Sequence, residues 1–314
     1  MGILSKEKMI KRIIIGDKLI YKEMRAQKQL SEEVLKKLEK CLTRILESST
    51  EREREKALQS YSKELASCSE VLRKRRLAIE KYVRDNFLER DVNEIRNILT
   101  SDNSLKDLKG ENGEVDLPIF VDDIDYTCLR GANYDLRLGV DVYVTAEKTP
   151  RKLTLMGADG VIAIEPGEFG ILMTHEYIFV PPDLIGFISV RLTFKQKGLV
   201  NISGFHADPG FYGRLMFAVY NAGPNDVPLR YKDRVFMIMF NELTKPWPKI
   251  KKSRWHGMKD IPIETIFGLR GTSVSVRNLD ERIKRLEMLF PIVVTGVVGV
   301  VVAVITWILT NLKG

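Results

Sequence analysis

The stretch Asn201–Gly223, with the sequence NISGFHADPGFYGRLMFAVYNAG, decides the fold of this chain. Apolar and polar residues alternate through it, and the alternation is interrupted by the tripeptide Asp-Pro-Gly at 208–210. Two alternating runs joined by a Pro-Gly turn predict a β-hairpin. Because the turn carries the carboxylate of Asp208 beside His206 and Phe211, it can also hold a ligand. The alternative is an ordinary hairpin in which Asp208 only caps the turn.

The chain around this hairpin has the same character. Short runs rich in Val, Ile, Phe, Tyr and Thr alternate with turns of Gly, Pro, Asn and Asp; they include Val140–Val144, Gly160–Ile164, Glu176–Val180 and Ile185–Arg191. Short strands at this spacing, without a helical period, are typical of a compact all-β barrel. We therefore predict a mainly β-barrel domain over residues 117–247.

Three ordered blocks resemble the dCTP deaminase/dUTPase family. They are the segment NYDLRLG at 133–139, the loop at 189–199 and the 208–210 turn with the strand after it. The resemblance implies a dUTPase-like barrel (a distorted jelly roll), a homotrimer, a role in nucleotide metabolism and a pyrimidine deoxynucleotide ligand, dCTP or dUTP. It also implies that Asp135 and Arg137 are buried on a core strand, where each pairs with the other or with a neighbour.

The same resemblance implies a triphosphate-binding loop in VRLTFKQKGL, residues 190–199. Arg191 and Gly198 match the family pattern, whereas Leu192 replaces a family serine and Gln196 replaces a family arginine. Hydroxyl groups, backbone amides and cations bind phosphate oxygens. The nucleotide-binding residues expected here are Arg191, Thr193, Lys195, Gln196 and Lys197. The alternative is a basic β-turn.

The resemblance places the base and the sugar at the hairpin. Ser203 matches a threonine of the deaminases, Gly204 stands for their small alanine, and Phe211 falls where an aromatic ring packs on the deoxyribose. The backbone of Ile202–Phe205 is expected to read the pyrimidine edge. The nucleotide-binding residues expected here are Ser203, Gly204, Phe205 and Phe211. Asp208 stands where dUTPases hold the carboxylate that orients the attacking water.

Ala218 stands where the deaminases of this family carry the glutamate that activates water. A methyl group cannot transfer a proton, and loss of such a base costs a factor of about 10²–10⁴ in rate, so deamination by the family mechanism is not expected. Hydrolysis through Asp208 is excluded less firmly than deamination, because this carboxylate is present. It usually needs Mg²⁺ on the phosphates and an arm that closes over them. Weak candidates for this arm are Gly268–Ser273 and the lid-like Trp255-His256-Gly257.

We expect no zinc and no resident metal. The three cysteines and the three histidines lie at no zinc-ligand spacing, and widely spaced cysteines form no disulfide framework. The net charge of +8 favours an anionic partner, which can be phosphate, membrane or nucleic acid. The basic run at 73–76 has no aromatic stacking platform beside it, so we interpret it as a solvated helix face and expect no nucleic-acid partner.

Residues 1–100 are predicted to be helical, with coiled-coil character. Apolar residues recur at three and four between Val34 and Leu46, and Thr50 with Glu53 predicts a capping box. After it we expect one long helix with a short heptad seam from Leu58 onward. This region either binds a protein partner or assembles the oligomer, or it forms a helical cap on the β domain. The polar stretch at 101–116 is predicted to be a linker.

The C-terminal part is predicted to be a membrane anchor. After a basic linker or lid arm at 248–273, apolar residues recur at heptad spacing (Val276, Leu279, Ile283, Leu286 and Phe290), which predicts a coiled-coil stalk at 274–287. Met288–Leu309 then runs for 22 residues without a charge, long enough to cross a bilayer. More cations precede this span than follow it, so we expect a single-pass C-terminal anchor with the bulk of the protein in the cytoplasm.

These observations lead to one function and two alternatives. We expect a membrane-tethered dCTP deaminase/dUTPase-like protein that binds a pyrimidine deoxynucleotide as a sensor or regulator. The first alternative is an active dUTP/dCTP pyrophosphatase that uses Asp208. The second is a structural adaptor that uses the barrel only to form a trimer.

Overall fold

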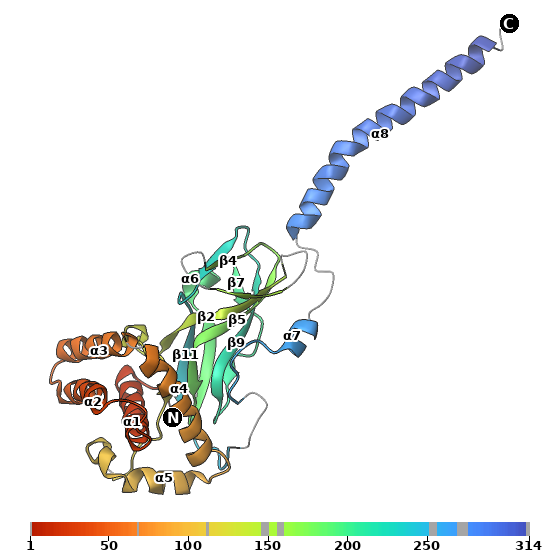
Figure 1. Ribbon diagram of the computed structural model, residues 1–314. Coiled ribbons are helices and arrows are strands. Elements are labelled where there is room, and N and C mark those ends of the chain that lie inside the picture. The colour runs from red at the N-terminus through yellow and green to blue at the C-terminus, as the bar shows by residue number, and fades with distance from the viewer. Residues whose placement is uncertain are drawn as a thin grey trace.

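The structure is a computed structural model that describes residues 2–67, 69–110, 113–145, 151–155, 160–250, 256–268 and 276–311. Its helices and strands fall into three parts: N-terminal helices, a curled sheet and one long C-terminal helix (Figure 1). The sheet lies between the two helical parts in the sequence. It positions the candidate site described below.

Nine strands of the described chain form one antiparallel sheet in the order β7-β9-β5-β2-β11-β6-β8, with β1 on β5 and β3 on β2. Their bounds are β1 Phe120–Val121, β2 Tyr134–Val144, β3 Arg151–Thr154, β5 Phe169–Phe179, β6 Leu184–Val190, β7 Leu199–Asn201, β8 His206–Ala207, β9 Tyr212–Asn221 and β11 Arg234–Glu242. A separate pair joins β4 (Val161–Ile164) to β10 (Val227–Arg230). The predicted mainly β domain is confirmed.

The sheet curls until its two ends meet near residues 202–205. Strands β7 and β8 lie at opposite ends of the strand order, yet only four residues separate them in the chain. Ile202 N donates to Ala218 O of β9 at 2.9 Å, and Ile188 N of β6 donates to Phe205 O at 2.8 Å. The segment between β7 and β8 therefore bridges β9 and β6, which gives the half-barrel its shape.

The predicted hairpin at 201–223 is wrong in its strand pairing. Strand β8 pairs with β6, while β9 pairs with β5 and β7. The turn at 208–210 does exist, with Gly210 at φ +85°, but it connects two distant strands of the sheet. Alternation predicts that a segment is extended and does not identify the strand that it pairs with.

Five α-helices of the described chain precede the sheet: α1 Lys6–Ala26, α2 Glu32–Glu47, α3 Glu51–Ala66, α4 Ser69–Asn86 and α5 Val92–Ser101. The capping box of Thr50 and Glu53 starts α3 as predicted. The single long helix expected after it is instead two helices, because α3 ends at Ala66 and α4 begins at Ser69. The heptad spacing of apolar residues continues through the break between α3 and α4, so this spacing alone cannot reveal the break.

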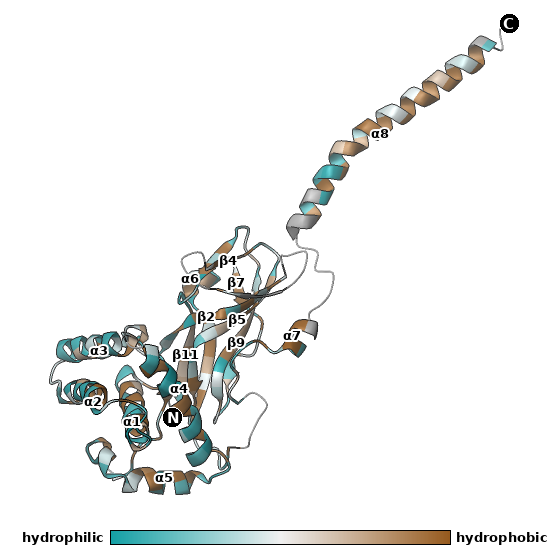
Figure 2. Ribbon diagram, viewed as in Figure 1, coloured by the Kyte–Doolittle hydropathy of each residue, from teal (hydrophilic) through white to brown (hydrophobic). Residues whose placement is uncertain are grey.

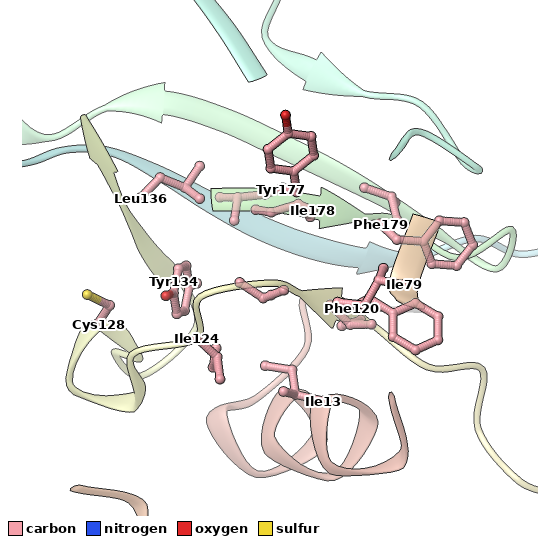
Figure 3. Close-up of a cluster of buried hydrophobic side chains, with 14 of the residues drawn as sticks. Ile13, Ile79, Phe120, Ile124, Cys128, Tyr134, Leu136, Tyr177, Ile178 and Phe179 are labelled. Atoms are coloured by element: carbon pink, nitrogen blue, oxygen red, sulfur yellow. The ribbon is translucent and has the colours of Figure 1, made fainter. Parts of the chain in front are cut away.

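The helices and the sheet share one hydrophobic core. Figure 3 shows Ile13 of α1 and Ile79 of α4 close to Phe120 and Phe179 of the sheet, and all four side chains are buried in the same cluster. The region predicted as a linker contributes to this core, because its 3₁₀ helix η1 (Asn103–Leu108) buries two leucines. This packing favours a helical cap on the chain's own β domain.

Buried charges also hold α4 against the sheet, which corrects the interpretation of the basic run at 73–76. Arg75 is 0% exposed, forms an ion pair with Asp17 of α1 and donates to Val121 O at 2.8 Å. Arg76 donates to Asp122 at 2.8 Å and lies 4.3 Å from the ring centroid of Tyr177. Two of the four cations in the run therefore join helix to sheet.

The first residues of the chain extend the sheet at β11. Leu4 N donates to Phe240 O at 2.8 Å, and Ile3 forms an isolated bridge with Asn241. Helix α1 then starts at Lys6, with the side chain of Ser5 accepting a hydrogen bond from Lys8 N. Segments more than 230 residues apart are thus neighbours in space.

After the sheet come α7 (Ile263–Gly268) and α8 (Val276–Asn311). Figure 1 shows α8 as one helix that extends away from the rest of the protein, and Figure 2 shows its apolar character. Within the described residues, one helix is long and apolar enough to cross a membrane; this candidate span covers 28 residues, Arg282–Leu309, and its most apolar window is not buried.

Candidate functional site

A cavity of about 630 Å³ opens beside the 208–210 turn. Its walls come from the end of the bridging segment, the start of β9 and the chain after β11. The lining residues are Ile188, Ser203, Gly204, His206, Ala207, Asp208, Pro209, Phe211, Leu215, Met216, Trp247, Ile250, His256 and Met258. Four residues that the sequence proposed for nucleotide binding or catalysis thus lie together: Ser203, Gly204, Asp208 and Phe211.

The segment after β11 closes one side of the cavity. Gly257 N donates to Tyr212 O at 2.7 Å, Arg214 N donates to Met258 O at 3.0 Å, and Met258 forms a parallel bridge with Gly213. A Cβ at Gly213 would lie 3.0 Å from Met258 N, so a glycine permits this close approach.

Two residues of the predicted lid, His256 and Gly257, therefore lie on the sheet. Trp255, together with residues 269–273 of the predicted arm, lies outside the described residues.

Two imidazoles and one carboxylate face the mouth of the cavity. His206 Nε2 lies 3.2 Å from Asp208 Oδ1, and the Asp208 side chain is 80% exposed. His256 Nε2 donates to Gly210 O at 2.9 Å. Burial lowers the pKa of His256, so this imidazole is neutral at pH 7. Asp208 is the only carboxylate among the described lining residues, and its exposure allows it to orient a water molecule.

Ala218 lies on β9, next to the bridging segment. It pairs with Ile171 of β5, and its carbonyl accepts the hydrogen bond of Ile202 N. On the other side of β9, the register with β7 pairs Asn201 with Val219, so Ile202 lies opposite Ala218. None of these neighbours has an ionisable side chain, so this stretch of β9 offers no group that can shuttle a proton.

The bridging segment is held by Asn201. The Asn201 Oδ1 atom accepts from Ser203 N at 3.2 Å and from Ser203 Oγ at 2.7 Å, and Asn201 Nδ2 donates to Gly204 O at 3.3 Å. Much of the backbone that was expected to read a base is thus already bonded within the protein. Within the described chain, the N–H groups of Gly204 and Phe205 have no protein partner, and of the two only Gly204 lines the cavity.

The predicted phosphate loop forms a short helical turn, α6 (Leu192–Lys195). Arg191 at its start lies 3.4 Å from Asp135 and donates to Arg234 O at 3.1 Å. Thr193, Lys195, Gln196 and Lys197 are exposed. None of the five expected phosphate-binding residues lines the cavity of the same chain, and neither does Phe205.

The loop depends on Gly198 to leave the helical turn. Gly198 has φ +101°, and a Cβ there would lie 2.2 Å from Gly223 N. Only glycine satisfies both constraints. The matched Gly198 therefore has a structural role here, whatever binds to the loop.

Asp135 and Arg137 are buried as expected, but they do not pair with each other. Arg137 donates to Glu176 at 2.6 Å and also contacts Asp123, whereas Asp135 interacts with Arg130 and Arg191. Tertiary neighbours supply the partners that spacing along one strand cannot identify.

The sequence analysis missed a buried cluster beside Arg137. His175 Nε2 lies 2.6 Å from Asp123 Oδ2, and the Tyr231 hydroxyl lies 3.2 Å from His175 Nδ1. Burial acts to raise the pKa of Asp123, but the hydrogen bond from His175 and the charge of Arg137 outweigh it and lower that pKa far below its usual range. It also missed the cavity wall formed by Trp247, Ile250 and Met258. No local sequence pattern indicates the buried cluster or the cavity wall, because both arise from the packing of segments that are distant in the sequence.

Comparisons with known proteins find relatives of the sheet-bearing part of the chain. A family profile described as dCTP deaminase-like matches residues 100–243. The dCTP deaminase of Pyrococcus abyssi is 31% identical over 133 residues, which cover 42% of this chain and 82% of that protein. The dCTP deaminase of Pyrococcus furiosus is 31% identical over 128 residues, which cover 41% of this chain and 78% of that protein.

Two solved structures complete the comparison. The 2'-deoxycytidine 5'-triphosphate deaminase of Agrobacterium tumefaciens aligns with a TM-score of 0.32 at 18% identity, covering 38% of this chain and 42% of that one. A native EIAV dUTPase aligns with a TM-score of 0.27 at 15% identity, covering 39% of this chain and 97% of that one.

Proposed function

This chain belongs to the dCTP deaminase/dUTPase-like family, and from that premise we propose that it binds a pyrimidine deoxynucleotide as a sensor or regulator. The ligand is dCTP or dUTP. The cavity beside the 208–210 turn receives the base and the sugar, with Phe211 against the sugar and the N–H group of Gly204 available to the base. Ser203 lies at the same wall.

The absence of a base at Ala218 carries this proposal. The β-strand position that a deaminase of this family uses for proton transfer holds a methyl group, and its neighbours Ile171 and Ile202 carry no acid. Losing such a group costs a factor of about 10²–10⁴ in rate. Binding can persist without it, because the cavity and the N–H group of Gly204 are independent of residue 218.

Assembly into a homotrimer completes the proposed site. The loop residues Arg191, Thr193, Lys195, Gln196 and Lys197 do not line the cavity of their own chain, so a neighbouring copy would have to bring its loop to the phosphates. Basic and hydroxyl groups suit that task. Mg²⁺ would arrive with the phosphates, since the described residues hold no group of three or more His, Cys, Asp or Glu arranged for a metal ion.

Helix α8 tethers the protein to a membrane in this proposal. The uncharged part of α8, residues 288–309, is about 33 Å long at 1.5 Å per residue, which matches the roughly 30 Å of a bilayer core. Three cations, Arg282, Lys284 and Arg285, lie at its N-terminal end. By the positive-inside tendency, the sheet and the N-terminal helices face the cytoplasm.

One experiment tests the proposal. The full chain in detergent is incubated with each dNTP and Mg²⁺; products are separated by chromatography and thermal unfolding is followed in parallel. We expect dCTP or dUTP to raise the melting temperature without turnover, and Phe211→Ala to weaken that shift. Rapid conversion of dCTP to dUTP would show that Ala218 does not disable the site. Neither a shift nor turnover would leave the structural adaptor as the better explanation.

A second candidate function is hydrolysis of dUTP or dCTP to the monophosphate. The observation in its favour is Asp208, an exposed carboxylate at the mouth of the cavity beside His206. Release of pyrophosphate that is lost in Asp208→Asn, and retained in Asp226→Asn on a remote exposed turn, would establish it.

A further inference from the structure

The first half of α8 presents an unpartnered apolar face. From here on, the name stalk means residues 276–290, the part of α8 before Pro291, rather than the predicted range 274–287. Within it Leu279, Ile283, Leu286 and Phe290 are 47%, 51%, 67% and 71% exposed. Their spacing of four, three and four places them on one side of the helix. Leu279, Ile283 and Leu286 precede the uncharged run 288–309, and apolar side chains in a row are costly in water unless another surface covers them.

The charges beside this face follow a heptad pattern. With Ile283 and Phe290 at position a, Leu279 and Leu286 fall at d, where a coiled coil has its core. The flanking positions e and g then hold Glu287 and Arg282. Asp280 also falls at position e, but it pairs with Lys284, at b of its own helix, at 2.5 Å.

The signs of these charges select one orientation. In a parallel coiled coil, position g of one helix faces position e of the next heptad on its neighbour. Arg282 therefore faces Glu287 of a second copy, an attractive pair. In an antiparallel arrangement like positions face each other, which brings Arg282 opposite Arg282. The uncharged part of α8 that continues beyond the stalk requires the same direction, because copies anchored in one bilayer emerge from it in parallel.

We propose that the stalk binds the stalk of a second copy of this chain as a parallel coiled coil, in the register that pairs Arg282 with Glu287. The occupant is the same helix, so no other protein is needed to cover the apolar face. The pairing is the same between neighbouring helices of a pair or of a trimer. It does not depend on the ligand of the cavity, and it holds or fails separately from nucleotide binding.

Cysteine cross-linking of the full chain in membranes tests the apolar face. Leu286→Cys at d should form an intermolecular disulfide on mild oxidation, whereas Arg285→Cys, one residue away at the outward position c, should not. The parent chain with its native cysteines sets the background. Equal cross-linking at the two positions, or none at either, would overturn the proposal.

Charge exchange tests the register in the Leu286→Cys background. Arg282→Glu places a carboxylate opposite Glu287 and should lower the cross-linking yield about fivefold, the effect expected from losing about two partly exposed charge pairs. Adding Glu287→Arg restores opposite charges and should restore the yield. An unchanged yield in the single variant, or no recovery in the double variant, would refute the Arg282–Glu287 pairing.

The readouts separate this inference from the proposed function. Nucleotide binding is measured as a melting shift of the cavity-bearing part, and stalk association is measured as a position-specific disulfide. A protein that shows the shift but no specific disulfide would refute the stalk alone.

Discussion

Replacing Arg75 should unfold this protein at a much lower temperature than replacing any neighbouring cation. The Arg75 side chain is 0% exposed, forms an ion pair with Asp17, and donates to Val121 O of the sheet. Tyr61 donates to the same carboxylate at 2.6 Å. Arg75→Met keeps the length of the side chain but leaves the Asp17 carboxylate buried without its cation.

The expected loss follows from that isolated charge. Removing one partner of a buried ion pair costs about 3–5 kcal/mol. For a folded unit of this size, each kcal/mol shifts the melting temperature by about 2–4 °C, so the predicted drop is roughly 6–20 °C. Arg73→Met, on the exposed side of the same helix, is the matched control and should change the melting temperature by less than about 2 °C.

The direction in which the stability loss of Arg75→Met changes with pH can also be predicted. Burial raises the pKa of Asp17, even though Arg75 opposes that rise. Without Arg75 the pKa rises further, and a group with a raised folded pKa favours the folded state at low pH and loses that effect as pH increases. The deficit of Arg75→Met should therefore be largest at pH 7 and shrink toward pH 4.

Thermal unfolding followed by circular dichroism at pH 7 and pH 4 measures both effects. Arg75→Met with Asp17→Asn should recover part of the stability, because the buried charge is then gone. A melting temperature for Arg75→Met equal to that of Arg73→Met would refute the argument. So would a deficit that grows as pH falls.

Three further predictions concern the site and its support. Ala218→Glu should raise dCTP deamination about 10²-fold over the parent, measured by chromatography, because it restores an acid at the proton-transfer position; unchanged activity would contradict the role assigned to residue 218. Gly198→Ala should destabilise the fold by more than about 1 kcal/mol in denaturant unfolding, whereas Gly204→Ala, which meets no atom within 4 Å, should not; equal effects would contradict it. Asp123 has a lowered pKa, so its contribution is complete above the usual Asp value of about 3.9 and is lost as pH falls below it; Asp123→Asn should flatten the acid loss of melting temperature, and a parallel acid loss in both proteins would contradict the role of the His175 pair.

The sequence predicted the extended segments and the turn of the β domain well, because period-two alternation and Pro-Gly dipeptides act locally. It placed Ser203, Gly204, Asp208 and Phe211 in one region, and they do line one cavity. The pairing of the strands could not be predicted from the sequence, because β8 joins β6 through contacts that the pattern within residues 201–223 does not encode.

The burial of individual charged residues could not be predicted from the sequence either. The run at 73–76 looks uniform in sequence, yet Arg75 is buried and Arg73 is exposed, since only the partner surfaces distinguish them. The cavity wall at Met258 was equally invisible, because it depends on where a remote segment settles on β9. Local chemistry predicts what a segment can do, and the tertiary neighbours decide which of those options is used.

The pairing of Leu4 with Phe240 has a consequence for synthesis of the protein. The two residues are joined by a backbone hydrogen bond, but a ribosome adding about 5–20 residues per second completes β11 roughly 10–50 s after it has made Leu4. During that interval the apolar face of α1 has no sheet to cover it. Helices α2 and α4, which share the hydrophobic cluster of α1, are made earlier and can cover part of that face, and the apolar part of α8 follows only after β11 has been made.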